Sequence, residues 1–172
     1  MNHVRIGEVK YTRKIVIRGG CQMANAGKQA IQLNVKNYIQ QDRDGQQVQE
    51  EFTTKTKGYY YEVGEAIYVE YEEKITENIV AVRLKFEAND KVTIRRQVNG
   101  TETTMNLVKG KKTDILYHVT GAQAITFQGQ LNLLNVDQND ADTFNARMAY
   151  NLYQSEEMIG QYQIELQTRV HV

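Results

Sequence analysis

The chain has 172 residues, which fits one domain and is long enough to bury a hydrophobic core. Basic and acidic residues both number 21, so no overall positive charge would attract nucleic acid. A single cysteine, Cys21, excludes an internal disulfide, and no apolar run reaches the ~18 residues of a membrane-spanning helix. We therefore expect a soluble protein that binds neither membranes nor nucleic acid, and the sequence predicts no cofactor and no metal site.

Residues 1–22 carry five basic residues against one acid. Their longest strongly apolar stretch, Ile15-Val16-Ile17, is too short for the core of a signal peptide, so we expect a cytoplasmic protein. Codons for Arg18-Gly19-Gly20 can spell a purine-rich ribosome-binding site just ahead of Met23. We predict Met23 as the true start and residues 1–22 as a non-native or disordered leader. A basic arm, or an extra edge strand at 13–18, is the alternative.

From Ala30 to Val170 the sequence is a series of short alternating apolar and polar runs without proline. Because successive side chains on a strand point to opposite faces, the alternation assigns an inner face to each run. The residues expected inward are Ile31/Leu33/Val35/Ile39, Tyr59/Tyr61/Val63, Ile67/Val69/Tyr71, Val80/Val82/Leu84/Phe86, Val92/Ile94/Val98, Met105/Leu107, Ile115/Tyr117/Val119, Ile125/Phe127/Leu131/Leu133, Phe144/Ala146/Met148/Tyr150/Leu152 and Tyr162/Ile164/Leu166/Thr168/Val170.

Turn residues separate these runs, and Asn99-Gly100 is the strongest hairpin signal. Leu134 and Val136 break the phase set by Leu131 and Leu133, which predicts a bulge, and Gly58 and Gly129 are expected to mark bends. No amphipathic helix is available to cover so long a sheet. We predict an all-β fold, a single antiparallel meander barrel of about 8–10 strands over residues 29–172, with a β-sandwich as the alternative.

Several short motifs occur in a characteristic order: Phe52 with Gly58-Tyr59-Tyr60-Tyr61, then Ile67 to Glu73, Val92 to Arg96, Met105 with Gly110, Tyr117, and Ala149 to Leu152. This order resembles the YwiB-like family of small, uncharacterised bacterial β-barrels, which are described as calycin-like or lipocalin-like. The resemblance covers nearly all of residues 29–170. It departs in a longer hairpin at 97–100 and a longer segment from His118 to Phe127. It implies a barrel with no established activity.

Arg96 is the most informative charged residue, because its phase places it inward with Ile94 and Val98. A buried guanidinium needs a partner, and the same phase argument places Glu73 inward. We hypothesise a Glu73–Arg96 pair near one end of the barrel. It would either anchor an acidic or polar group of a ligand, or serve as a structural ion pair or a charge at the rim.

Tyrosines are the other candidates for a ligand site, since their hydroxyl groups could line a small apolar pocket. Together with Glu73 and Arg96, the tentative ligand-binding residues are Tyr59, Tyr61, Tyr71, Tyr117 and Tyr150. The alternative is that these tyrosines fill the barrel core. Both hypotheses predict burial, but only the pocket hypothesis predicts an internal void of ligand size.

Other polar residues are assigned to the surface. His118 has the opposite phase to Tyr117 and is expected to face solvent, without the partner that a general base needs. The acidic residues Glu70, Glu72 and Glu77 are interpreted as a solvated edge rather than a metal site. The lysines at 109, 111 and 112 are interpreted as part of an exposed loop rather than a phosphate site.

Two hypotheses of function follow. The first is a cytoplasmic barrel that binds a small, partly apolar or amphipathic ligand in its interior. The alternative is a non-enzymatic protein-protein interaction module with a solidly packed barrel, as a monomer or homodimer. An enzyme ranks third, because the sequence has no recognisable nucleophile and base, metal cluster or phosphate loop, and so no catalytic residue is predicted.

Overall fold

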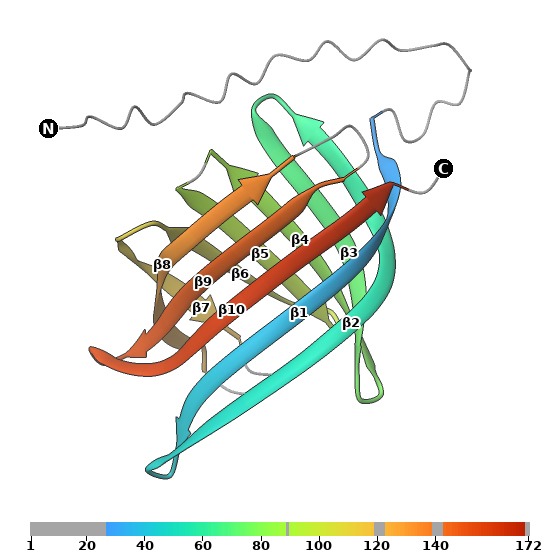
Figure 1. Ribbon diagram of the computed structural model, residues 1–172. Coiled ribbons are helices and arrows are strands. Elements are labelled where there is room, and N and C mark those ends of the chain that lie inside the picture. Colours follow the sequence, from blue (N-terminus) through green and yellow to red (C-terminus); the bar gives the residue numbers. More distant parts are fainter. Residues whose placement is uncertain (1–26, 89, 119–122, 139–142, 171–172) are drawn as a thin grey trace, which may run out of the picture.

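The computed structural model describes residues 27–88, 90–118, 123–138 and 143–170, and the regular structure in these ranges is all β-strand (Figure 1). Ten strands correspond to the ten predicted runs: β1 (Gln29–Arg43), β2 (Gln46–Val63), β3 (Ala66–Ile75), β4 (Asn78–Glu87), β5 (Lys91–Val98), β6 (Thr101–Val108), β7 (Lys112–Tyr117), β8 (Ile125–Asp137), β9 (Asn145–Gln154) and β10 (Glu157–Val170). Within these ranges there is no helix that could span a membrane. The expected leader, 1–22, and the expected start at Met23 lie outside the described residues.

The strands form one sheet in the order β6-β5-β4-β3-β2-β1-β10-β9-β8-β7. Antiparallel pairing of β1 with β10, from Ile31↔Val170 to Gln41↔Gly160, joins the first and last strands. The two end strands of the sheet, β6 and β7, meet at a tight turn, where the Gly110 amide donates a hydrogen bond to the Leu131 carbonyl at 2.9 Å. The sheet is therefore rolled into a nearly closed meander barrel, which confirms the predicted fold class.

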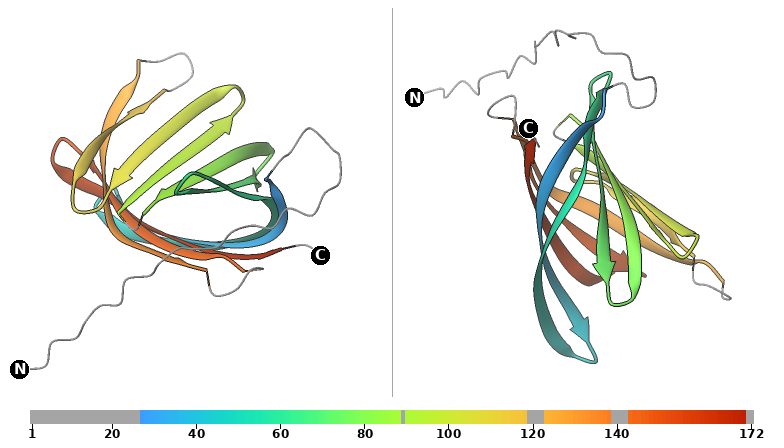
Figure 2. Two further views of the ribbon diagram at one scale, coloured as in Figure 1. Left: turned by 90° about the horizontal axis from the view of Figure 1, so that it is seen from above. Right: turned by 90° about the vertical axis from the view of Figure 1, so that its right-hand side faces the viewer.

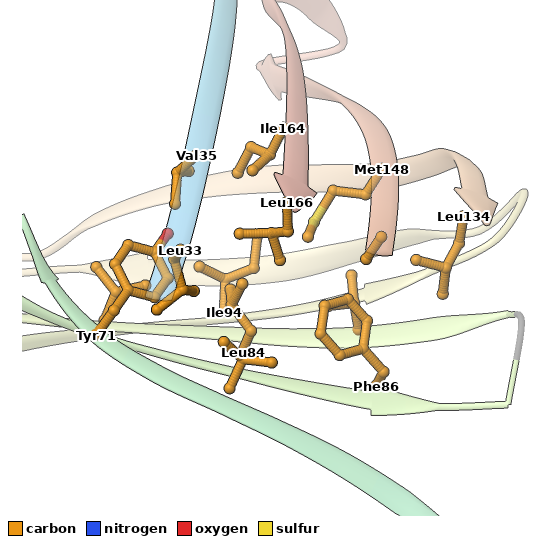
Figure 3. Close-up of a cluster of buried hydrophobic side chains, with 14 of the residues drawn as sticks. Leu33, Val35, Tyr71, Leu84, Phe86, Ile94, Leu134, Met148, Ile164 and Leu166 are labelled. Atoms are coloured by element: carbon orange, nitrogen blue, oxygen red, sulfur yellow. The ribbon is translucent and has the colours of Figure 1, made fainter. Parts of the chain in front are cut away.

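Apolar side chains fill the space between two walls of this barrel. In the left view of Figure 2, β1, β9 and β10 form one wall and β3 to β6 lie opposite. Leu33 and Val35 of β1, with Leu166 of β10, face Leu84 and Ile94 of the other wall (Figure 3). These five side chains are at most 3 % exposed, so the walls are packed directly on each other.

Aromatic rings close one end of the barrel, the end that carries the turns after β2, β4, β6 and β8. The Phe144 ring lies 5.5 Å from that of Tyr60 and 5.6 Å from that of Phe86, measured between centroids. Thr168 fixes the start of β9, since its hydroxyl donates to the Phe144 carbonyl at 2.8 Å and accepts from the Phe144 amide at 3.1 Å. We call this the closed end, and the other, which carries the turns after β1, β3, β5, β7 and β9, the open end.

The inward phase predicted for β2 is wrong. Tyr59, Tyr61 and Val63 lie on the outer face, and Tyr60, only 8 % exposed, points into the core. Gly58 pairs with Ile31 of β1 and Tyr71 of β3, which both face the interior. Tyr60, two residues further along β2, therefore faces the interior as well. Three consecutive tyrosines place an aromatic residue in both phases, so their alternation could not determine the face.

Gly58 is also the point where β2 parts from β3. Strand β3 pairs with β2 only from Gly58 to Val63, whereas β1 pairs with β2 from Gln46 to Tyr60. A Cβ atom at Gly58 would lie 2.1 Å from the Glu70 carbonyl oxygen, so no other residue fits this approach. Below it, β1 is the one described neighbour of Gln46–Lys57. We call this segment of β2 the free edge, and the β1–β2 hairpin that carries it projects beyond β3 (Figures 1 and 2).

Other local predictions are confirmed. Asn99 and Gly100 both have positive φ, 49° and 77°, as a two-residue hairpin turn between twisted strands requires. In β8 the register shifts between Leu131 and Leu133, which is the predicted bulge. Leu134, 2 % exposed, therefore takes up the inward phase after the shift, whereas Leu133, predicted inward, lies opposite Ala149 on the outer face.

Candidate functional site

Glu73 and Arg96 meet on the inner face near the open end. Arg96 lies opposite Val82 of β4, and Val82 lies opposite Tyr71 of β3. The three residues therefore lie in one row across the inner face. The Arg96 Nη2 atom donates to the Glu73 Oε2 atom at 2.9 Å. The Glu73 side chain is 5 % exposed and that of Arg96 is 40 % exposed, so the guanidinium extends from the interior to solvent. The predicted ion pair is confirmed, and its role in ligand binding stays a prediction.

Two of the predicted tyrosines lie beside this pair. Tyr71 and Tyr150 are 5 % and 6 % exposed. Burial, and then the negative charge of Glu73, raise the pKa of the Tyr71 hydroxyl well above its usual value. Burial, and then the neighbouring Tyr162, likewise raise the pKa of Tyr150. Both hydroxyls therefore stay protonated at neutral pH and can donate hydrogen bonds.

Tyr162 and Gln41 extend the group. The rings of Tyr150 and Tyr162 are stacked, with centroids 5.1 Å apart, and the Gln41 side-chain amide donates to the Tyr162 hydroxyl at 2.5 Å. Gln41 was missed, although it follows Ile39 in the inward phase of β1 and that phase could have identified it. We call the residues Tyr71, Glu73, Arg96, Tyr150 and Tyr162 the polar cluster.

The other three candidate tyrosines lie elsewhere. Tyr59 and Tyr61 lie on the outer face, since β2 has the opposite phase to the one predicted, and Tyr59 is 45 % exposed. Tyr117 has the predicted inward phase, but it ends β7 at the mouth of the barrel and is 45 % exposed. Its ring contacts Phe127, with centroids 6.3 Å apart. Of the three, Tyr59 lines a concavity, open to solvent, that also reaches Tyr71 of the polar cluster.

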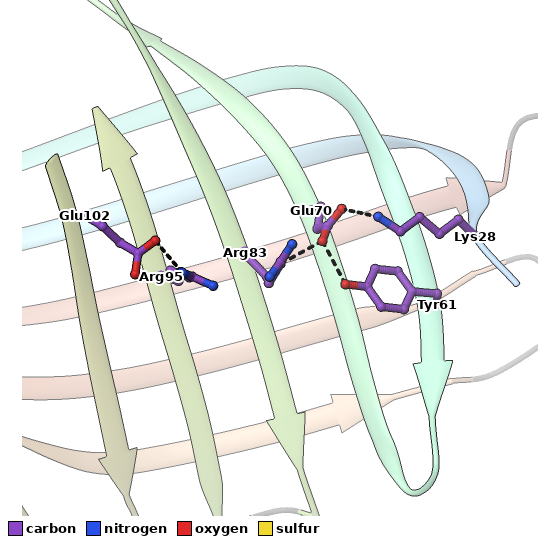
Figure 4. Close-up of polar contacts among 6 residues, drawn as sticks. All are labelled: Lys28, Tyr61, Glu70, Arg83, Arg95 and Glu102. Atoms are coloured by element: carbon purple, nitrogen blue, oxygen red, sulfur yellow. Dashed lines mark hydrogen bonds and ion pairs between the residues drawn. The ribbon is translucent and has the colours of Figure 1, made fainter. Parts of the chain in front are cut away.

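A second charged group lies on the outer face of the same wall (Figure 4). The Glu70 carboxylate accepts hydrogen bonds from Lys28 at 2.8 Å and from Tyr61 and Arg83 at 2.7 Å each. Partial burial opposes its ionisation, but these three hydrogen bonds outweigh it and lower the pKa of Glu70. Burial and the bond to Glu70 raise the pKa of Tyr61 to about 12. Glu70 is therefore the centre of an ion-pair network rather than part of a solvated edge.

Of the remaining surface predictions, some are confirmed and one is wrong. His118 is exposed, as expected, and so are Lys109 and Lys111. Lys112 instead begins β7, where its ammonium group lies 3.0 Å from the Glu156 carboxylate and 4.1 Å from the centre of the Tyr153 ring. The lysine segment is thus a tight turn followed by an anchored strand, rather than one exposed loop.

Two of the concavities that the described residues form are open to solvent. The larger of the two, about 1000 Å³, lies where β2 parts from β3. One side is formed by β1 and β2 residues that include Thr56 and Lys57 of the free edge, and the other by outer-face residues of β3 to β6, with Tyr71 and Val82 between them. The smaller, about 650 Å³, is lined mostly by polar outer-face residues of β1, β2, β9 and β10. Neither is an enclosed chamber inside the barrel, because core side chains occupy the inner face from the polar cluster to the closed end.

Exposed apolar side chains gather at the open end. Most of the large apolar residues with substantial exposure belong to strand segments near its turns: Ile75, Ile79, Leu116, Tyr117, Ile125 and Met158. Phe52, 38 % exposed, lies on the free edge. The side chains at the open end come from the segments on either side of three turns, those after β3, β7 and β9.

The fold is also that of a solved structure. The crystal structure of the ywiB protein from Bacillus subtilis matches with a TM-score of 0.66 and 20% sequence identity, over 84% of this chain and 94% of that chain. An identity this low shows the shared fold alone. No curated protein matches this chain. The family model described as "Domain of unknown function (DUF1934)" matches residues 33–166, which is almost the whole barrel. The chain therefore belongs to the DUF1934 family, and it has the barrel fold of the ywiB protein.

Proposed function

We propose that this barrel is a non-enzymatic, cytoplasmic protein-protein interaction module. The observation that carries the proposal is the free edge, Gln46–Lys57, which has a described strand on one side only. The unpaired N–H and C=O groups of a sheet edge are a template for another chain, and natural sheets usually shorten, cover or bend such edges or place charged side chains on them. Here the register with β1 runs without a bulge along the whole segment.

Two further observations support an interaction module over an interior ligand site. Packed side chains occupy the inner face, which leaves the deep interior to the core. Exposed apolar residues gather at the open end, the end at which the free edge projects.

Site-directed photo-crosslinking in cells tests this proposal. A crosslinking residue placed at Thr53, on the free edge, should capture a discrete polypeptide. The same residue at Thr93, on the outer face of β5, which is paired on both sides, is the matched control and should capture little. Equal yields from the two positions, or no product from position 53, would contradict the proposal.

A second candidate is a small acidic, partly apolar ligand bound at the open end. Arg96 favours it, because the guanidinium has five donor N–H groups and only one bond, to Glu73, is found among the described residues. The Nδ2 atom of Asn37, a residue 8 % exposed on the inner face of β1, also lacks a hydrogen-bond partner there. A ligand carboxylate could bind Arg96 in a bidentate manner.

The Arg96→Met variant tests this candidate against Arg95→Met. Arg95 is the next residue on β5, points outward and pairs with Glu102 at 2.5 Å. A ligand anchored by Arg96 would be retained by the protein with Arg95→Met and lost with Arg96→Met. Retention by both variants would rule out the anchor.

A further inference from the structure

On the outer face of the free edge, a negative charge precedes two positive charges along the chain. Glu51, Lys55 and Lys57 lie opposite Tyr38, Asn34 and Gln32 of β1, so all three belong to the outer face. All three are exposed, and among the described residues none of them forms an ion pair. The acid is therefore nearer the start of the segment and the bases nearer its end.

Two copies of the segment that run antiparallel can therefore place charges of opposite sign next to each other. In an antiparallel pair, directly opposite residues share a face and their side chains interact. Two copies of β2 related by a two-fold axis at Thr53 place Glu51 of each copy opposite Lys55 of the other. The same register places Gln49 opposite Lys57 on the outer face and Phe52 opposite Thr54 on the inner face.

Neighbouring registers are less favourable. An axis at Glu51 or at Lys55 would place like charges opposite each other, which is destabilising. An axis at Phe52 would leave Glu51 opposite Thr53 and Lys55 opposite Gln49, without an opposite charge. An axis at Thr54 would place Glu51 opposite Lys57 but would place Lys55 opposite Thr53, without an opposite charge. The axis at Thr53 pairs the closest charges of opposite sign.

We infer that the partner of the free edge is a second copy of this chain, joined by antiparallel pairing of the two β2 strands about Thr53. This inference rests on the proposed function, because it names the partner of the same edge. The dimer continues the β1–β2 ribbon of one copy into that of the other and gives the edge amides and carbonyls partners that the described strands do not supply.

Sedimentation of the full chain tests the inference with charge reversals. Glu51→Lys alone makes both cross-pairs Lys–Lys, and Lys55→Glu alone makes both Glu–Glu. Each variant should dimerise about tenfold more weakly or worse. An equimolar mixture of the two should form a heterodimer, since each Lys then faces a Glu, and the double variant Glu51→Lys with Lys55→Glu should dimerise like the wild type. Glu77→Lys, an exposed reversal at the β3–β4 turn, is the control and should change nothing.

Each outcome decides the inference. A wild-type chain that stays monomeric at all concentrations, or a dimer indifferent to both reversals, overturns it. If the chain is monomeric and position 53 crosslinks to another polypeptide, the interaction module stands and the self-pairing fails. A crosslink from position 53 to residues 1–26 of the same monomeric chain shows that the chain covers its own edge, which also overturns the inference. Absence of both dimer and crosslink removes the proposed function as well.

Discussion

The two ends of the barrel use the same alternating strands in different ways. At the closed end, Tyr60, Phe86 and Phe144 pack ring against ring, and Thr168 binds both backbone groups of Phe144. At the open end, the inner face carries an ion pair and stacked tyrosines, and apolar residues are exposed at the turns. The closed end has the features of a fold-stabilising core, while the open end retains the groups that can interact with other molecules.

The parting of β2 from β3 at Gly58 produces much of this difference. From Gly58 toward the closed end, β2 pairs with β3 and the wall is continuous. From Gly58 toward the open end, this pairing stops and the free edge begins. Polar groups such as Arg96 can then lie on the inner face and still reach water, which avoids the high cost of a fully buried guanidinium. Substitutions at the two ends should therefore differ in size and in kind.

The largest effect is expected at the closed end. Phe86→Ala removes a ring that is 2 % exposed and should reduce the free energy of unfolding by about 3–5 kcal/mol in urea denaturation. Ile79→Ala, at a position that is 62 % exposed at the other end of the same strand, is the control and should change the free energy of unfolding by less than about 0.5 kcal/mol. Similar losses in the two variants would show that the closed end is not the better packed one.

The polar cluster should give the next largest effect. Arg96→Met leaves the buried Glu73 carboxylate without its cation and should cost about 3 kcal/mol, whereas Arg95→Met on the outer face should cost less than about 1 kcal/mol. Adding Glu73→Leu to Arg96→Met should recover part of the loss, because it removes the unpaired charge. A variant with Arg96→Met as stable as the wild type would mean that the pair contributes no stability.

Gly58→Ala tests the junction between the two ends. The new methyl group would meet the Glu70 carbonyl oxygen at 2.1 Å, so β2 and β3 must move apart, at a cost of about 1–3 kcal/mol. Hydrogen exchange should quicken at the amides of Tyr59 to Val63. Gly64→Ala, which also replaces a glycine but has no neighbour within contact range, separates this steric effect from the strain of a positive φ. Unchanged exchange in the variant with Gly58→Ala would contradict the close approach.

The outer network should give the smallest effect, visible as a dependence on pH. Because the pKa of Glu70 is lowered in the folded state, its contribution is present above the pKa of the unfolded chain, about 4.3, and is lost as the pH falls through the folded value. With Glu70→Gln, the free energy of unfolding should fall less on acidification than it does in the wild type. The difference should be less than about 1 kcal/mol and should shrink in high salt. Glu72→Gln, on the same face, should retain the acid dependence of the wild type.

Sequence alternation succeeded where one phase alone is apolar. Val80, Val82, Leu84 and Phe86 leave no other choice of face for β4, and the inner positions of Arg96 and Glu73 followed from the same rule. It failed at Tyr59-Tyr60-Tyr61, where both phases are aromatic. It also could not show that Tyr117 would be exposed, because phase assigns a face and not a depth in the barrel. The free edge was beyond prediction, since the length over which two strands pair depends on how the whole sheet closes.

Native mass spectrometry of the full chain, purified without denaturation, tests the central claim most directly. If the barrel works through its open end and free edge, subunits of the bare polypeptide mass should be released from a dimer, and Glu51→Lys should shift that dimer to monomer. A defined small-molecule adduct that is lost on unfolding and in the variant with Arg96→Met, on a chain that stays monomeric, would contradict the account and make this protein a ligand-binding barrel.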